Sequence, residues 1–133
     1  MPYEIQWLIQ DRVVYLRDYD VCTLEQFTAA LETLNQHFDT GTPPLYMVHD
    51  NREVQQYPTS LSAFRAIMKP HPAVAHLVYI RNPRQPTTRF ITTILSTIAG
   101  TEFSYVDEVE EAVLLLKAID PTLEALSSLT TLS

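Results

Sequence analysis

The sequence predicts an α/β domain in which helices pack on a mixed, mostly parallel five-stranded sheet that opens with an antiparallel hairpin. Three observations predict this fold. Segments with strand periodicity alternate with segments of helical spacing, no stretch has the composition of a linker, and a length of 133 residues fits one domain. Because strand–helix–strand steps make right-handed crossovers, three such steps in succession imply parallel strands.

The strands follow from their side-chain patterns. Apolar and polar residues alternate in the first strand, and a tight turn at 11–12 joins it to the second as a hairpin. The third is apolar throughout, which is typical of a strand covered on both faces, and Asp50 is expected to end it. The expected strands cover residues 3–9, 13–19, 45–49, 74–80 and 102–106.

The helices follow from capping residues and apolar spacing. Thr23 and Gln26 have the spacing of a capping box, and Asp107 and Glu110 repeat it before the last helix. Prolines at 70 and 121 are expected to stop the helices that precede them. The four helices are expected over 23–38, over 61–68, up to Ile98, and from 109 to the proline at 121.

The chain has two glycines, and their positions exclude several enzyme classes. Gly41 and Gly100 each follow an amphipathic run and are expected to close a helix. No glycine remains for a phosphate loop, a dinucleotide fingerprint or a nucleophile elbow. The sequence therefore predicts a binding or regulatory domain and no enzyme, and it indicates no cofactor.

Charge is distributed unevenly along the chain. Residues 51–100 carry six basic side chains and one acidic side chain, a net +5, so the remainder carries −12 of the overall −7. Nucleic acid is a poor partner for so acidic a chain, whereas a protein partner or a second copy in a homodimer fits the opposite charges. Alternatively, the charges only solvate separate helix faces. The chain has no apolar run long enough for a membrane span, and we expect a cytoplasmic location.

From about Tyr3 to Ala118 the chain resembles the SpoIIAA-like proteins of the STAS superfamily. Four pieces carry the resemblance: the opening hairpin before the Thr23 helix, and residues 45–50, 76–82 and 103–112. The resemblance implies a small mixed sheet with packed helices, no catalytic centre, and a regulatory protein–protein interaction role in a bacterial setting.

The end of the chain is set apart from this domain. The resemblance places a STAS-like domain at 1–120 and leaves 121–133 as a leucine-repeat helix or tail, with leucines at 123, 126, 129 and 132. These leucines pack either on the sheet of their own domain or on a second chain.

Two hydroxyl side chains are candidates for phosphorylation or partner contact. STAS proteins that antagonise anti-sigma factors carry a phosphorylatable serine at the start of the helix after the third strand, and by resemblance this position falls on Thr59, with Ser60 beside it. Pro58 and Leu61 replace the acidic residue and the glycine that are usual there. The alternative is that Thr59 or Ser60 only caps the helix.

The turn at 81–89 is a candidate anion site. Ligands of open parallel sheets bind beyond the carboxyl ends of the strands, where this turn is expected. A phosphate or carboxylate, from a small ligand or a lipid headgroup, would be held by Arg81, Arg84, Thr87, Thr88 and Arg89. Alternatively, these arginines pair with the acidic carboxy-terminal helix.

The histidines do not have the spacing of metal ligands. His49, His71 and His76 are the candidates, but no cysteine or second carboxylate accompanies them at a suitable spacing. No metal site is expected.

Overall fold

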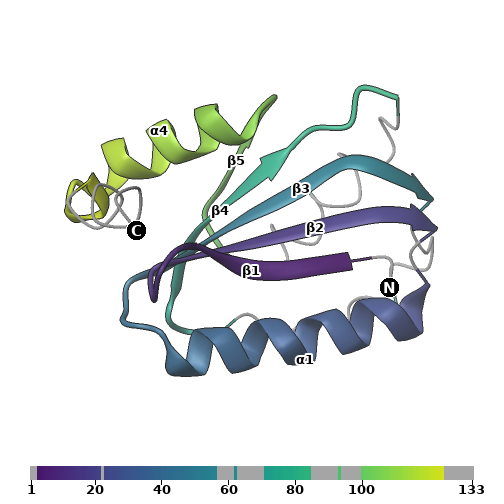
Figure 1. Cartoon of the computed structure of the whole chain (residues 1–133), viewed down its shortest axis with the longest axis horizontal. Coiled ribbons are helices and arrows are strands. Elements are labelled where there is room, and N and C mark those ends of the chain that lie inside the picture. The colour runs from purple at the N-terminus through teal and green to yellow at the C-terminus, as the bar shows by residue number, and fades with distance from the viewer. Residues whose placement is uncertain are drawn as a thin grey trace.

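The structure is a computed structural model, and it describes residues 3–21, 23–56, 62, 71–84, 93 and 100–124. Figure 1 shows a twisted sheet with one helix on each of its faces within this part of the chain. The elements in chain order are β1 (Tyr3–Ile9), β2 (Val13–Val21), α1 (Leu24–Thr40), β3 (Leu45–Gln56), β4 (Val74–Ile80), β5 (Phe103–Val106) and α4 (Val109–Ile119).

The predicted sheet is confirmed. Its five strands lie in the order β1-β2-β3-β4-β5; the β1–β2 pair is antiparallel and the three following pairs are parallel. The hairpin turns at Asp11, which has a positive φ of 64°, and the Arg12 amide closes the turn on the Ile9 carbonyl at 3.0 Å. Helix α1 is the crossover from β2 to β3.

The prediction that Asp50 ends the third strand is wrong. Strand β3 runs on to Gln56 because β2 also extends, to Val21, and the two strands stay paired. The register shifts between Arg17 and Tyr19, so β3 carries a bulge just after Asp50. A polar sequence can remain a strand here because its side chains find partners across the sheet, as described below.

The core has two layers, one on each face of the sheet. Successive side chains of a strand point to opposite faces, so Val13 and Tyr15 face α4 whereas Val14 and Leu16 face α1. The α4 layer includes Val48, Val78, Ile80, Ala112 and Leu116, and the α1 layer includes Leu34, Phe38, Leu45 and Met47. Each fully buried aliphatic side chain contributes about 1.5–3 kcal/mol.

One predicted capping box is confirmed and the other is wrong. The Gln26 amide donates to Thr23 Oγ1 at 3.2 Å, and the Thr23 amide donates to Gln26 Oε1 at 3.1 Å. At α4, however, the N-cap is Glu108, whose side chain makes no cap hydrogen bond. The Asp107 carboxylate accepts two hydrogen bonds from Arg81 instead, at 2.9 and 2.8 Å. A bidentate guanidinium outcompetes a single backbone amide.

Gly41 closes α1 as predicted, but not through a left-handed backbone, since its φ is −79°. A Cβ there would lie 2.7 Å from Leu45 Cδ2, 3.0 Å from the Asp11 carbonyl oxygen and 3.0 Å from Trp7 Cη2. Close approach of three segments therefore requires glycine. Gly100 has a φ of +72°, and the helix expected before it lies outside the described residues.

The segment after α4 is held against the hairpin turn. Arg12, only 8% exposed, donates to the Pro44 carbonyl at 3.0 Å, to Thr122 Oγ1 at 3.1 Å and to Asp120 Oδ2 at 2.6 Å. Hydrogen bonds, first from the Thr122 hydroxyl and then from Tyr46, hold the pKa of Asp120 below its ordinary value.

Leu123, fully buried, packs in the α4 layer, so the first of the four repeated leucines contacts its own domain. The other three, at 126, 129 and 132, lie outside the described residues.

Candidate functional site

A polar pocket lies at the carboxyl ends of the central parallel strands. Its volume is about 380 Å³, within the range of small-molecule sites. The described walls come from the ends of β2 and β3 and from the segment after β4. The described lining residues are Tyr19, Asp20, Arg52, Glu53, Val54, Asn82 and Arg84. This is the carboxyl edge of the sheet, where ligands of open α/β sheets bind, although the sequential strand order here contains no reversal.

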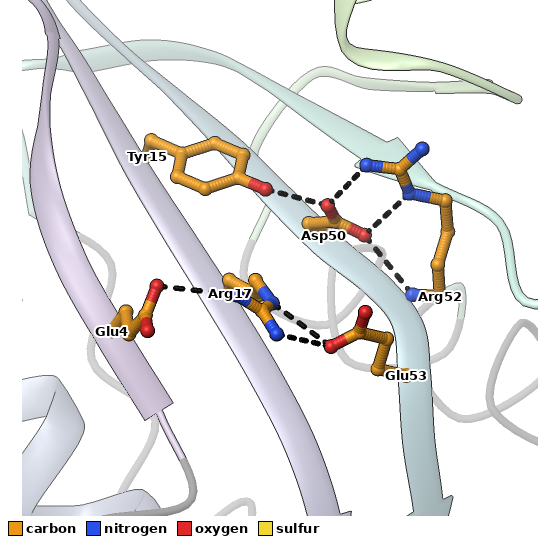
Figure 2. A network of polar contacts seen from close by, with 6 residues as sticks. All are labelled: Glu4, Tyr15, Arg17, Asp50, Arg52 and Glu53. Carbon is orange, nitrogen blue, oxygen red and sulfur yellow. Dashed lines mark hydrogen bonds and ion pairs between the residues drawn. The ribbon is translucent and has the colours of Figure 1, made fainter.

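The buried carboxylate of Asp50 lies next to the pocket and binds the side chain of Arg52, one of the lining residues. Asp50 is 2% exposed and accepts hydrogen bonds from Tyr15 Oη at 2.5 Å and from Arg52 Nη2 at 2.8 Å. Arg52 adds two further bonds, from its amide and from Nε, each at 3.0 Å. Figure 2 shows Tyr15 and Arg52 reaching Asp50 from opposite sides. The guanidinium of Arg52 is thus fixed before any ligand arrives.

These contacts move all three pKa values away from neutrality. Burial acts to raise the pKa of Asp50, but hydrogen bonds from Arg52 and Tyr15 outweigh it and hold the pKa below its ordinary value. Burial, followed by the hydrogen bond to Asp50, raises the pKa of Tyr15 to about 12. The same carboxylate raises the pKa of Arg52. At neutral pH the site therefore holds an ionised acid, a neutral phenol and a cation.

A second ion-pair network engages Glu53, the acidic residue of β3 that lines the pocket. Arg17 on β2 donates to Glu53 through Nε at 3.0 Å and also through Nη2, and it reaches Glu4 on β1 at 3.3 Å. Its guanidinium also lies 5.1 Å from the centre of the Tyr19 ring. Figure 2 shows this network beside the Asp50 cluster. Glu53 thus has a cationic partner, which it shares with Glu4.

The loop after β4 is anchored to β3 by a buried amide. Asn82 Nδ2 donates to the Val54 carbonyl at 2.9 Å, and Asn82 Oδ1 accepts from the Arg84 amide at 3.0 Å. These bonds set the backbone of Arg84 at the pocket wall. Neither Arg84 nor Asp20 forms an ion pair with any residue that the structure describes.

Of the two predicted anion-binding residues that the structure describes, one lines the pocket and the other does not. Arg84 lines the pocket, whereas Arg81 is engaged by Asp107 and does not line it. The other three, Thr87, Thr88 and Arg89, lie outside the described residues, as do Thr59 and Ser60.

Sequence reasoning missed most of the pocket. Asp20, Arg52 and Asn82 were not singled out, although each lies at or beyond the end of an apolar strand segment. Ligands of open α/β sheets bind beyond the carboxyl ends of the strands. Considering the carboxyl ends of all three neighbouring strands, rather than one turn, would have found these residues.

The histidines have other partners. His49 Nε2 lies 2.5 Å from Asp18 Oδ2, with side-chain exposures of 6% and 1%. His71 lies 2.8 Å from Asp39, and His76 lies 2.9 Å from Ser104 Oγ. Across the described ranges, no three histidine, cysteine or acidic side chains gather as metal ligands would.

These features define an α/β protein with a SpoIIAA-like fold and a polar pocket at the carboxyl edge of its sheet. The fold assignment comes from a crystal structure of an uncharacterized protein of the DUF3478 family, with a SpoIIAA-like fold, from Shewanella loihica. The two chains superpose with a TM-score of 0.56 at 19% identity, over 86% of this chain and 91% of that one. No family model and no curated protein matches the sequence. Among the described helices, none has the length and apolar character to cross a bilayer.

Proposed function

We propose that this chain is a binding domain, not an enzyme, and that the pocket at the carboxyl ends of β2, β3 and β4 holds a small anionic group. One observation carries the proposal: Arg84 lines the pocket and has no ion-pair partner in the described part of the chain. An arginine held at a pocket wall presents several donors to a carboxylate or phosphate.

The two arginines of the pocket have different roles. Arg52 donates three hydrogen bonds to Asp50, so its charge already has a partner. These bonds also fix the position of the Arg52 side chain in the pocket wall. Arg84 is attached to the fold through its backbone, by Asn82, which leaves its side chain to meet a ligand. We therefore assign the anion to Arg84.

The titrating groups next to the pocket are unsuited to proton transfer. A general acid or base works best when its pKa lies near the working pH. The pKa of Asp50 is below its ordinary value and that of Tyr15 is about 12, so both keep one protonation state at neutral pH. This supports a binding role rather than catalysis.

The proposal is tested by isothermal titration calorimetry with ethyl phosphate and with propionate as probes. Wild type is expected to bind at least one of the two, and Arg84→Gln is expected to weaken that binding about tenfold or more. Arg81→Gln is the matched control, since it removes an arginine from the same segment but not from the pocket. The proposal is wrong if Arg84→Gln binds like wild type, or if neither probe binds.

A second candidate is the regulatory protein–protein interaction that the sequence favoured. It is supported by Leu114, which is 68% exposed on α4, and by Ile119, which is 45% exposed at its end. Large apolar side chains in such positions are found at interfaces. Sedimentation velocity of wild type and Leu114→Ser over a range of concentrations tests the homodimer: a dimer abolished by the substitution supports it, and a monomer throughout rules it out.

A further inference from the structure

We infer that the ligand of this pocket is a zwitterion, whose anionic group binds Arg84 and whose cationic group binds Asp20. The inference rests on the proposed function and names the class of ligand. It follows from which of the charged side chains that line the pocket have ion-pair partners and which do not.

Among the residues that the structure describes, four charged side chains line the pocket, and two of them have ion-pair partners. Arg52 pairs with Asp50 at 2.8 Å, and Glu53 pairs with Arg17, which also contacts Glu4. Within the described residues, the ion pairs leave one cation and one anion at the walls, Arg84 and Asp20. The described wall charges without an ion-pair partner are thus one of each sign.

The two charges come from different strands of the sheet. Asp20 belongs to β2 and Arg84 follows β4, while β3 lies between those two strands. Because neighbouring strands are about 4.8 Å apart, the backbones of β2 and β4 are separated by about 10 Å. A ligand between them that carries both charges would satisfy both walls at once.

The backbone at Asp20 supports a ligand contact. Its φ is 57°, in the left-handed region that L-residues seldom adopt. Disfavoured backbone conformations of this kind recur at ligand clamps. In this structure Asp20 is turned to line the pocket.

An anion without a cationic group fits the pocket less well. It would gain the contact with Arg84 but would bring a like charge towards Asp20. A primary ammonium on the same ligand would turn that repulsion into a charge-assisted hydrogen bond. The pocket therefore discriminates between an anion and the corresponding zwitterion.

Two matched pairs of probes test this by titration calorimetry: ethyl phosphate against phosphoethanolamine, and propionate against β-alanine. In one pair or the other, wild type is expected to bind the zwitterion about tenfold more tightly than the anion. Asp20→Asn should remove this preference and keep binding of the anion, whereas Arg84→Gln should weaken both. Asn tolerates a positive φ, so the fold at position 20 is preserved.

Asp11→Asn is the matched control, because Asp11 also has a positive φ, 64°, but lies in the β1–β2 turn away from the pocket. Equal affinity for anion and zwitterion overturns this inference and leaves the proposed function standing. A preference that survives Asp20→Asn also overturns it. Loss of all binding, in contrast, overturns the proposed function itself.

A phosphate zwitterion can be a free metabolite or a lipid headgroup. Flotation with phosphatidylcholine vesicles, with and without phosphatidylethanolamine, distinguishes these sources. Recovery that requires phosphatidylethanolamine and is lost in Asp20→Asn supports a headgroup, and binding of free phosphoethanolamine alone supports a soluble ligand.

Discussion

The hydrogen bond between Tyr15 and Asp50 makes a prediction for the variant Tyr15→Phe. The substitution removes the hydroxyl that donates to the buried carboxylate at 2.5 Å, while Arg52 continues to satisfy both carboxylate oxygens. Hydrogen bonds to charged groups contribute about 1.5–3 kcal/mol. Because Asp50 keeps its other donors, we expect a loss near the lower limit, about 1.5 kcal/mol at neutral pH.

The raised pKa of Tyr15 also predicts how the free energy of unfolding changes in the alkaline range. The pKa of Tyr15 is raised from 10.0 to about 12, so the stability linked to its neutral form is complete below pH 10 and is lost as pH rises through 12. Two pKa units correspond to about 2.7 kcal/mol, and roughly half of this is lost by about pH 11. The free-energy difference between wild type and Tyr15→Phe should therefore shrink by about 1.4 kcal/mol between about pH 8 and pH 11.

Urea unfolding followed by circular dichroism measures both effects. The other tyrosines titrate equally in wild type and variant, so the difference isolates Tyr15. Tyr19→Phe is the matched control at neutral pH, since its ring contacts Arg17, and it should change the free energy of unfolding by less than about 0.5 kcal/mol. A difference between wild type and Tyr15→Phe that stays constant from about pH 8 to pH 11 would refute the reasoning.

Three further substitutions test the fold by urea unfolding. Gly41→Ala should destabilise the protein by about 1–3 kcal/mol, because its Cβ would lie 2.7 Å from the buried Leu45 side chain; unchanged stability would contradict this. Asp18→Asn should cost about 1–3 kcal/mol by removing a carboxylate from the buried hydrogen bond with His49, and unchanged stability would show that this carboxylate is dispensable. Asp120 has a lowered pKa, so its contribution is present at neutral pH and is lost as pH falls; the stability gap between wild type and Asp120→Asn should narrow on acidification, and a constant gap refutes this.

Much of the fold follows from local sequence patterns. Alternation in β1, the capping box at Thr23 and the apolar run that begins β3 each act over a few residues, and the structure confirms all three. The end of β3 was missed because residues 50–56 are mostly polar. Their strand conformation depends on pairing with β2, and a polar segment does not show this by its own periodicity.

The site was less predictable because its charges pair over long sequence distances. Arg81 bonds to Asp107, 26 positions later, and Arg17 bonds to Glu53, 36 positions later. Both pairs depend on strand register and order, which set the neighbours of each side chain. The sequence identified Arg84 through the rule for carboxyl ends, but it did not show that Arg81, three residues earlier, is engaged elsewhere.

The balance of paired charges explains how a chain with a net charge of −7 can offer a site to an anion. The overall field repels anions, but a contact depends mostly on the charges within about 10 Å, since salt screens those that are farther away. At the pocket, Arg52 and Glu53 each have an ion-pair partner. Among the described residues, the proposed ligand would therefore meet Arg84 and Asp20 as the wall charges without such a partner. The proposed selectivity rests on the described side chains that line the pocket without an ion-pair partner, which come from β2 and from the segment after β4.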